Sequence, residues 1–378
     1  MQQAVFGVVG LGHIAQTQHL PNLARAPHAR LKAECDLDPA KVRQTQESYQ
    51  VPRGTTDLDD LLNDDEITAV VIATSGPTHV PLTLQALAAG KSVYVEKPLA
   101  EAPEECEAVV AAQRESRRFV AVGFNRRFAP AYVSAKQIID QRGGAWNIHY
   151  RIADEYWLWG RNFPPGTRVI HEVCHIFDVV RWLSGQEVES VYCVTSRADD
   201  EVIALRMSGG CAVTIMDSGY ATMDMPKEYL TVIVDRGGLT VEDFVELHCF
   251  GGASEEWVQR FAGHTHPGRE YGYRPLYQAL GGEALRAMRR TAWELRAQEG
   301  RGELVGPHAE EARRFLREGV VGWNYTSDKG WLAAIDHFAE CVAAGTPPRN
   351  AGPEDGLIAA RLAQAAIRSR ETGQVVRL

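Results

Sequence analysis

Long apolar runs are absent from this sequence. No stretch of about 18 consecutive apolar residues occurs, so we expect no membrane-spanning helix. Positive charge is also in deficit: 40 Lys and Arg stand against 49 Asp and Glu, for a net charge of −9. That balance speaks against sequence-independent binding to nucleic acid, which relies on basic surfaces.

Cysteines are few and scattered. There are seven, an odd number, and no Cys-x-x-Cys pair occurs. This pattern is typical of reduced thiols rather than of a disulfide framework. The N-terminus also lacks the basic region and cleavage site of a signal peptide. We therefore expect a cytoplasmic protein.

The length and composition indicate a globular protein with more than one domain. At roughly 150 residues per domain, the 378 residues correspond to about 2.5 domains. A composition of 45% hydrophobic and 24% charged residues excludes disordered, collagen-like and coiled-coil proteins.

The first 124 residues alternate short apolar runs with helical patterns. Strands are predicted at 4–9, 30–35, 68–73, 92–95 and 119–122. Helices are predicted at 14–26, 39–49, 58–62, 77–89 and 103–118. This alternation predicts a doubly wound parallel sheet, so residues 1–124 are expected to form a Rossmann domain.

The pattern changes after residue 124. Strands are predicted at 146–153, 188–195, 202–207, 212–217, 229–235 and 239–245, and helices at 170–183, 329–344 and 354–372. Glycine-rich turns between the strands favour a mostly antiparallel sheet. The Arg- and Glu-rich segment 263–326 reads as a helical insertion. We therefore expect an α/β protein whose second domain, 125–378, is α+β with a large, open, mostly antiparallel sheet.

A glycine-rich turn, Gly10-Leu11-Gly12-His13-Ile14-Ala15, directly follows the first strand. Gly10 permits the tight turn, Gly12 lets the backbone approach a pyrophosphate, and the following helix N-terminus offers N–H donors. Asp36 closes the second strand, 24 residues beyond Gly12. A carboxylate there accepts hydrogen bonds from the adenosine ribose and repels a 2′-phosphate, so NAD is favoured over NADP. The alternative is a plain glycine turn with Asp36 as a helix cap, although Asp38-Pro39 fits that cap better.

A second candidate site is Glu96-Lys97-Pro98, at the end of the strand predicted at 92–95. Ligands of open α/β sheets bind at the carboxyl ends of strands. A lysine beside a cationic nicotinamide ring has its ammonium form disfavoured, which suits a role in proton transfer. On its own the motif indicates no more than a polar turn.

Several motifs together closely resemble the Gfo/Idh/MocA oxidoreductase family. They are the glycine turn, Ala73-Thr74-x-x-Pro77-x-His79, Gly90-Lys91-x-Val93-x-x-Glu96-Lys97-Pro98, Gly123-Phe124-Asn125-Arg126-Arg127-Phe128 and His175-x-x-Asp178. The resemblance covers nearly the whole first domain, continues to about residue 250 and resumes near residues 328–330.

The resemblance implies an NAD-dependent dehydrogenase that acts on a secondary hydroxyl of a sugar, inositol or related polyol. It implies that Lys97 touches the reacting hydroxyl, that Glu96 lies near the nicotinamide ribose and that His175 is the acid/base group. The expected cofactor-binding residues are Gly10, Gly12, His13, Ile14, Asp36, Thr74, His79, Glu96 and Lys97. The family also implies a homodimer or homotetramer that associates through the open sheet face.

The sequence departs from the family around the acid/base histidine. Many members carry Asp four residues before it, whereas this chain has His171, followed by Glu172. On one continuous helix His171 and His175 share a face. The proton relay is therefore either the two histidines or a path through Glu172, with His175 as the first choice.

Residues that precede this helix are candidates for the substrate site. They are Tyr156, Trp157, Trp159 and Arg161, and the motif residue Arg127 joins them by resemblance. Aromatic rings stack on sugar rings, and Arg161 or Arg168 suits a carboxylate if the substrate has one. Loop packing or an oligomer contact is the alternative for the tryptophans.

Other functions fit parts of the sequence. His171-Glu172-Val173-Cys174-His175 matches the His-Glu-x-x-His pattern of zinc proteases, but a nucleotide-binding domain has no place in such an enzyme. We therefore expect no metal. An NAD-dependent glycosidase-like enzyme with transient oxidation and a non-catalytic NAD-sensing regulator remain alternatives of the same fold.

Overall fold

The computed structural model describes residues 3–154, 156–160, 162–221, 227–252, 257–261 and 327–378, with the backbone alone for residues 158 and 159. Two compact units are formed. Unit 1 comprises Met1–Phe128, Ile170–Val179 and Gly330–Gln364, and unit 2 comprises Ala129–Val169, Val180–Lys329 and Ala365–Leu378. The chain thus first leaves unit 1 close to the predicted boundary, and two later segments return to it. The predicted insertion at 263–326 lies outside the described residues.

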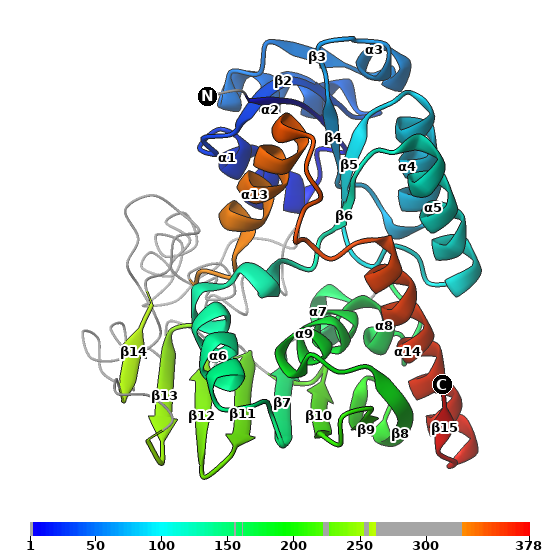
Figure 1. The fold of residues 1–378 in the computed structure, drawn as a ribbon. Helices are drawn as coiled ribbons and strands as arrows, with labels where there is room; N and C mark the ends of the chain where they lie inside the picture. Colours follow the sequence, from blue (N-terminus) through cyan, green and yellow to red (C-terminus); the bar gives the residue numbers. More distant parts are fainter. Residues whose placement is uncertain (1–2, 155, 161, 222–226, 253–256, 262–326) are drawn as a thin grey trace, which may run out of the picture. The chain divides into compact units, whose positions relative to one another are not determined.

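Unit 1 is built on a parallel sheet of six strands in the order β3-β2-β1-β4-β5-β6 (Figure 1). The strands are β1 (Ala4–Val9), β2 (Ala29–Cys35), β3 (Arg53–Thr55), β4 (Ala69–Ile72), β5 (Ser92–Val95) and β6 (Val120–Val122). The strand order reverses between β1 and β4, which is the position where open α/β sheets bind ligands. The predicted Rossmann architecture is therefore confirmed, and only the short strand β3 was not expected.

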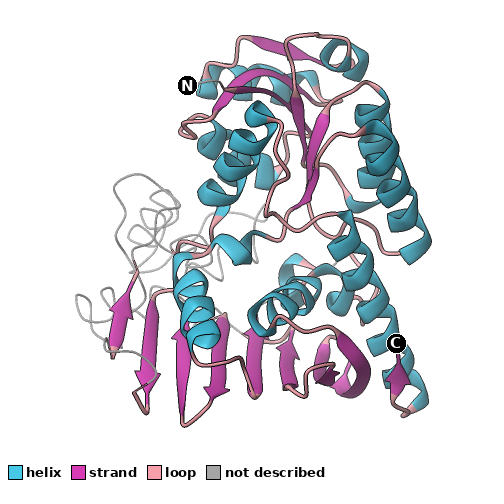
Figure 2. Ribbon diagram, in the orientation of Figure 1, coloured by secondary structure: helices cyan, strands magenta, loops and turns pink. Residues whose placement is uncertain are grey.

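Helices cover both faces of this sheet (Figure 2). They are α1 (Leu20–Leu23), α2 (Pro39–Tyr49), α3 (Leu58–Leu62), α4 (His79–Ala88), α5 (Pro103–Ser116), α13 (Trp331–Ala344) and the start of α14 (Pro353–Thr372). One apolar core joins the sheet to α3, α4, α5 and α14, and the other joins it to α1, α2 and α13. In the second core, Phe338 of α13 packs edge-on against Phe6 and Tyr94, with ring centroids 6.4 and 5.8 Å apart.

The helix predicted at 14–26 differs from the expectation. It begins as a wide helical turn, Ala15–His19, and continues as the short α1. The wide turn brings the buried His19 ring against Tyr94 and Trp331. Local sequence did not indicate this turn, because its packing partners come from distant parts of the chain.

Unit 2 is built on a nine-stranded sheet in the order β14-β13-β12-β11-β7-β10-β9-β8-β15. The strands are β7 (Asn147–Ala153), β8 (Val188–Arg197), β9 (Asp200–Met207), β10 (Ala212–Ser218), β11 (Glu228–Val234), β12 (Gly237–Glu242), β13 (Glu246–Phe250), β14 (Val258–Arg260) and β15 (Val376–Arg377). Only β7 and β10 pair in parallel. The expected mostly antiparallel sheet is therefore confirmed.

Local details of unit 2 differ from the prediction. The strand predicted to reach residue 245 ends at Glu242, because Asp243 and Phe244 turn the chain with φ angles of 44° and 66°. Helix α6 (Pro130–Gln141), which packs on β12 and β13, was not predicted. Short helices α7 (Tyr156–Trp159) and α8 (Arg168–His171) precede α9 (Cys174–Ser184).

The helix predicted at 170–183 is wrong in one respect: it is interrupted at Glu172 and Val173, between α8 and α9. In a continuous helix the His171 carbonyl would accept the N–H of His175. Here the Lys97 ammonium donates a hydrogen bond of 2.6 Å to that carbonyl, and the His175 N–H donates to the Glu172 carbonyl. A tertiary contact therefore replaces one bond of the helix.

All seven cysteines are buried and free of disulfides, as predicted. Among the described helices, none has the length and apolar character needed to span a bilayer.

Unit 1 also buries an acidic side chain that forms no ion pair with another described residue. Glu34 on β2 is fully buried and accepts a hydrogen bond of 2.8 Å from the Thr45 hydroxyl on α2. Burial raises the pKa of Glu34 to about 7. The folded state therefore binds this proton more tightly than the unfolded chain does.

This tighter proton binding predicts a pH dependence of stability. Between pH values of about 4.5 and 7 the contribution of Glu34 is progressively lost as pH rises, on the order of 3 kcal/mol. Glu34→Gln should remove this component. Between pH 5 and pH 8 the free energy of unfolding, measured by urea titration, should therefore fall less in the variant than in wild type. Glu47→Gln, a change at an exposed residue of α2, is the control. A Glu34→Gln variant that loses stability in parallel with wild type over this range would contradict the prediction.

Candidate active site

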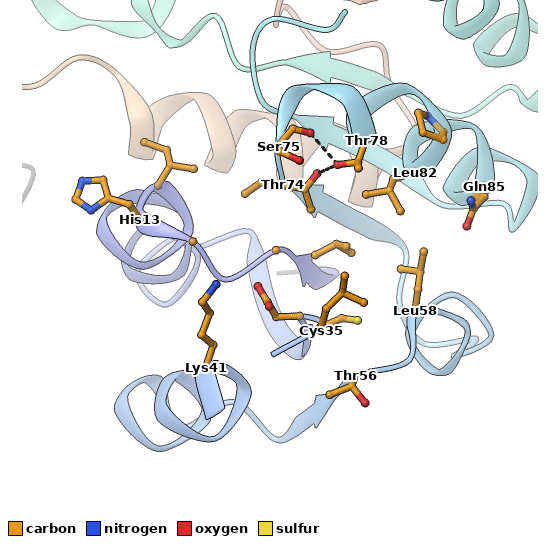
Figure 3. A pocket seen from close by; sticks show the side chains of 18 residues that line it. His13, Cys35, Lys41, Thr56, Leu58, Thr74, Ser75, Thr78, Leu82 and Gln85 are labelled. Carbon is orange, nitrogen blue, oxygen red and sulfur yellow. Dashed lines mark hydrogen bonds between the residues drawn. The ribbon is translucent and has the colours of Figure 1, made fainter. Parts of the chain in front are cut away.

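A pocket of about 710 Å³ lies in unit 1 at the carboxyl ends of β1, β2 and β4 (Figure 3). Six of the nine predicted cofactor residues line it: Gly10, Gly12, His13, Ile14, Asp36 and Thr74. The Thr78 hydroxyl lies 2.7 Å from that of Thr74 and fixes the loop after β4. The strand order and the glycine turn therefore place these residues around one cavity.

The two glycines of the turn have different structural roles. Gly10 adopts a φ of +88°, and a Cβ there would lie 2.7 Å from the Ala73 carbonyl oxygen. At Gly12 a Cβ would meet no atom within 4 Å. Gly10 is therefore needed by the fold itself, whereas the space above Gly12 is open to a ligand.

Asp36 ties the glycine turn to the start of α2. Its Oδ2 accepts the Leu11 N–H at 2.7 Å, and its Oδ1 accepts the Asp38 N–H at 2.9 Å. The N-cap of α2 is Asp38, which accepts the Ala40 N–H at 2.8 Å. The alternative that Asp36 is the helix cap is therefore wrong, and its carboxylate lines the pocket.

Lys41 is a pocket residue that the sequence reasoning missed. It lines the pocket, and Figure 3 shows its side chain extending from α2 toward the cavity. The sequence did contain a signal for it. Lys41 lies in the first turn of α2, and this turn comes soon after Asp36 at the end of β2, so its side chain starts close to the pocket.

Glu96 is buried at the end of β5, on the strand next to β4. Its Oε1 lies 2.8 Å from Nε2 of the buried His19, and its Oε2 accepts the Lys97 N–H at 3.2 Å. Burial opposes ionisation of Glu96, but the hydrogen bond and charge of His19 outweigh it and lower the pKa of the carboxyl. Gly123 leaves room for this carboxylate, since a Cβ there would lie 3.1 Å from Oε1.

His79 connects the same two strand ends. Its Nδ1 lies 2.7 Å from the Pro98 carbonyl oxygen, and its Nε2 lies 3.2 Å from the Thr74 carbonyl oxygen. The ring is buried. His79 therefore connects the loop after β4 to the loop after β5.

The Lys97 side chain leads to the break between α8 and α9. Besides the His171 carbonyl, its Nζ contacts Oε2 of the buried Glu172 at 3.3 Å. Arg126, from the turn after β6, places Nη2 at 3.9 Å from Oε1 of the same carboxylate. Glu172 thus lies between two cations, and sequence reasoning missed Arg126 although it lies in a recognised motif.

The two histidines of this region have separate surroundings. His175 is buried in the first turn of α9, with its ring edge-on to Phe124 at 5.8 Å. Nε2 of His171 lies 3.6 Å from Oε1 of Glu101. Because the helix is interrupted between them, His171 and His175 do not lie on one face of a continuous helix. Lys97 contacts the backbone carbonyl of His171 and the carboxylate of Glu172.

The same break bears on the zinc-protease pattern. That pattern needs two histidines one turn apart on an unbroken helix, with the glutamate available as a base. Here the helix is interrupted between the histidines, and Glu172 lies against Lys97. Among the described residues no group of three or more His, Cys, Asp or Glu side chains is arranged to hold a metal ion.

Arg127 is held by two carboxylates of unit 1. Its Nε lies 2.9 Å from Oδ2 of Asp178 on α9, and its Nη2 lies 2.9 Å from Oδ1 of Asp355 on α14. This geometry favours a role in positioning α9 over a direct contact with substrate.

The remaining predicted substrate residues belong to unit 2. Tyr156 is buried and stacks on Phe163, with ring centroids 6.3 Å apart. Trp157 is partly exposed, and its Nε1 donates to the Ala221 carbonyl at 3.4 Å. The side chain of Trp159, and Arg161 as a whole, lie outside the described residues.

Comparison with known proteins identifies the first domain. Residues 5–124 match the model of the oxidoreductase family with an NAD-binding Rossmann fold. This part of the chain is therefore similar to the NAD-binding domain of the Gfo/Idh/MocA oxidoreductases. It is 25% identical to inositol 2-dehydrogenase of Salmonella typhimurium, over 97% of this chain and 94% of that one. It is 35% identical to inositol 2-dehydrogenase of Acidothermus cellulolyticus, over 50% of this chain and 56% of that one.

Solved structures show the same fold over the full length. Scyllo-inositol dehydrogenase from Lactobacillus casei, with bound NAD(H) and scyllo-inositol, has a TM-score of 0.71 at 19% identity. That alignment covers 100% of this chain and 99% of the other.

The different surroundings of the two glycines predict different effects of the same change. Gly12→Ala should leave the melting temperature near that of wild type but weaken NADH binding at least tenfold, because the new methyl fills the open space. Gly10→Ala should also lower the melting temperature, because its Cβ meets backbone atoms. Calorimetry and NADH fluorescence titration measure the two effects. Wild-type NADH affinity in Gly12→Ala would contradict this reading of the pocket.

Proposed function

We propose that the protein is an NAD-dependent dehydrogenase that oxidises a secondary hydroxyl of a polyol such as an inositol. The observation that carries the proposal is the position of Lys97. Its ammonium, at the carboxyl end of β5, is held by the His171 carbonyl and the Glu172 carboxylate in the unit that contains the glycine-turn pocket. The relationship to inositol 2-dehydrogenases supports the substrate class.

The pocket residues fit a dinucleotide. The open space above Gly12 admits a pyrophosphate, and the Asp36 carboxylate lines the pocket next to the second strand. A bound nicotinamide dinucleotide supplies the hydride acceptor for oxidation of a C–OH group. In the proposal Gly12 and the helix N-terminus hold the phosphates, and Asp36 selects the ribose that lacks a 2′-phosphate.

The chain's own side chains manage the proton. His175 accepts the hydroxyl proton as general base, as the family resemblance implies. Lys97 donates a hydrogen bond to the oxygen on which negative charge develops. Glu172 accepts a hydrogen bond from Lys97 at 3.3 Å and keeps its Nζ in place. His19 fixes the orientation of Glu96 and thereby the start of the loop that bears Lys97.

Loss of either proposed catalytic side chain should affect turnover more than binding. Lys97→Ala and His175→Ala should each lower kcat for polyol oxidation by about 10²- to 10⁴-fold, while the Kd for NADH stays within about threefold of wild type, since neither residue lines the pocket. His28→Ala, a change at a partly buried histidine of the same unit, is the control. Stopped-flow kinetics and NADH fluorescence measure both quantities. Near-normal kcat in both variants would refute these roles.

Asp36 should set the preference between NAD and NADP. Asp36→Ser should raise kcat/KM with NADP and lower it with NAD, each by about tenfold, because a charge that repels the 2′-phosphate is removed. Lys41→Ala in the Asp36→Ser background should reverse part of the gain, since Lys41 then faces the phosphate. Steady-state kinetics with both cofactors measure the change. An unchanged cofactor ratio in Asp36→Ser would show that another group selects the cofactor.

A screen of sugars, inositols and sugar acids for NAD reduction tests the proposed function directly. Stoichiometric NADH with a polyol supports it. Consumption of a glycoside without net NADH would instead identify transient oxidation, and NADH binding without turnover across the panel would identify a sensor. Metal analysis of the same preparation completes the test, because zinc required for activity would overturn the proposal. A cytoplasmic location and a homodimer or homotetramer remain predictions from the sequence.

A further inference from the structure

Two acidic side chains face each other inside unit 2. Glu201 on β9 and Asp217 on β10 are direct partners across the antiparallel strand pair. Both lie on the buried side of the sheet, with exposed fractions of 2% and 1%. Like charges directly opposite each other in a sheet are destabilising, so this pair needs a physical explanation.

Each carboxyl has one oxygen bound to an arginine. Oε1 of Glu201 accepts from Nη1 of Arg370 at 2.6 Å, and Oδ1 of Asp217 accepts from Nε of Arg168 at 2.7 Å. The second oxygens, Oε2 of Glu201 and Oδ2 of Asp217, are buried and have no hydrogen-bond partner among the described residues. A proton held between these two oxygens would satisfy both.

The charges around the pair lead to the same conclusion. The groups linked to the pair come from β8, α8 and α14 and from three loop positions: Cys193, Arg168, Arg370, Asp154, Asp199 and Lys227. In this described cluster four carboxyls face three cations, so one negative charge is in excess. Burial raises the pKa of Glu201 and of Asp217, and the arginines only partly oppose that effect.

The cluster holds the segment 162–168, which leads into α8. Oδ1 of Asp199 accepts the N–H groups of Gly166 and Arg168 at 2.9 and 3.0 Å. Arg370 also donates to the Gly166 carbonyl at 3.1 Å. The segment therefore depends on the two arginines that bind the carboxyl pair.

Arg168 extends this attachment to an aromatic residue. Its guanidinium pairs with Asp154 at the end of β7 and lies 5.4 Å from the ring centroid of Tyr156, which stacks on Phe163. Arg168 is also the first residue of α8. The last residue of that helix is His171, and its carbonyl accepts the hydrogen bond from Lys97.

We propose that Glu201 and Asp217 share one proton at neutral pH and act as positioning residues that hold segment 162–168 and Tyr156 through Arg168 and Arg370. Loss of the proton places two negative charges opposite each other and loosens the segment. The folded state binds this proton more tightly than the unfolded chain, so the stabilisation is present at lower pH and is lost as pH rises through the titration of the pair. Only the kinetic arm of the test below rests on the proposed function.

Infrared spectroscopy detects the shared proton without any activity. Wild type at pH 7 should show a protonated-carboxyl C=O band component that is absent in Glu201→Gln and in Asp217→Asn. Both changes keep the side-chain size and supply an N–H toward the facing oxygen, which favours folding. Glu189→Gln, at an exposed residue of β8, is the control and should leave the band unchanged. The same band in all four proteins would overturn the proposal.

Hydrogen exchange tests the positioning role. Amides of residues 162–168, corrected for the intrinsic pH dependence of exchange, should lose protection in wild type as pH rises from 7 to 10. Glu201→Gln should keep its protection throughout, because it cannot lose the shared proton. Equal loss of protection in wild type and Glu201→Gln would refute the role of the pair.

Kinetics with myo-inositol form the third arm. In wild type kcat/KM should fall about tenfold per pH unit above the pH at which the pair loses its proton, mainly because KM rises. This alkaline limb of the pH profile should be absent in Glu201→Gln. A limb that persists unchanged in Glu201→Gln would count against the proposal. Absence of any turnover of myo-inositol would count against the proposed function instead, and the two spectroscopic arms would still decide whether the proton is shared.

Discussion

The contact between the Lys97 ammonium and the His171 carbonyl is the interaction on which the candidate active site depends. A helical carbonyl normally bonds to an N–H four residues later, and here a side chain from the end of β5 takes its place. The helix consequently breaks, and Glu172 at the break meets the same lysine. The helix interruption, the Glu172 carboxylate and the Lys97 ammonium thus come together at one hydrogen bond.

Several buried charged groups have an oppositely charged partner beside them, in each of the two units. In unit 1 His19 pairs with Glu96, and Arg127 pairs with Asp178. In unit 2 Lys329 pairs with Glu228, which also accepts a hydrogen bond from the Tyr150 hydroxyl. Removing one member of such a pair leaves the other buried without compensation, which destabilises the fold.

The sequence was most informative where structure is determined locally. Apolar runs and helical periodicity predicted the parallel sheet, and the turn chemistry of Gly10, Gly12 and Asp36 predicted the pocket. Contacts between distant residues were not accessible in this way. His19 and Glu96 are 77 residues apart, and Lys97 and Glu172 are 75 apart. Nothing in the pattern around His171 indicates that a distant lysine competes for its carbonyl, so a single continuous helix was the natural expectation.

The position of α13 has a consequence for biosynthesis. This helix, residues 331–344, covers one face of a sheet whose strands all lie within the first 122 residues. Phe6 and Tyr94 therefore leave the ribosome more than two hundred residues before Phe338, which packs against both. Until α13 is synthesised, only α1 and α2 of the described helices cover this face of the sheet, and the part that α13 covers in the finished protein stays exposed. Its completion is tied to the synthesis of the C-terminal segment, and chaperones that bind apolar surfaces have their main opportunity in that interval.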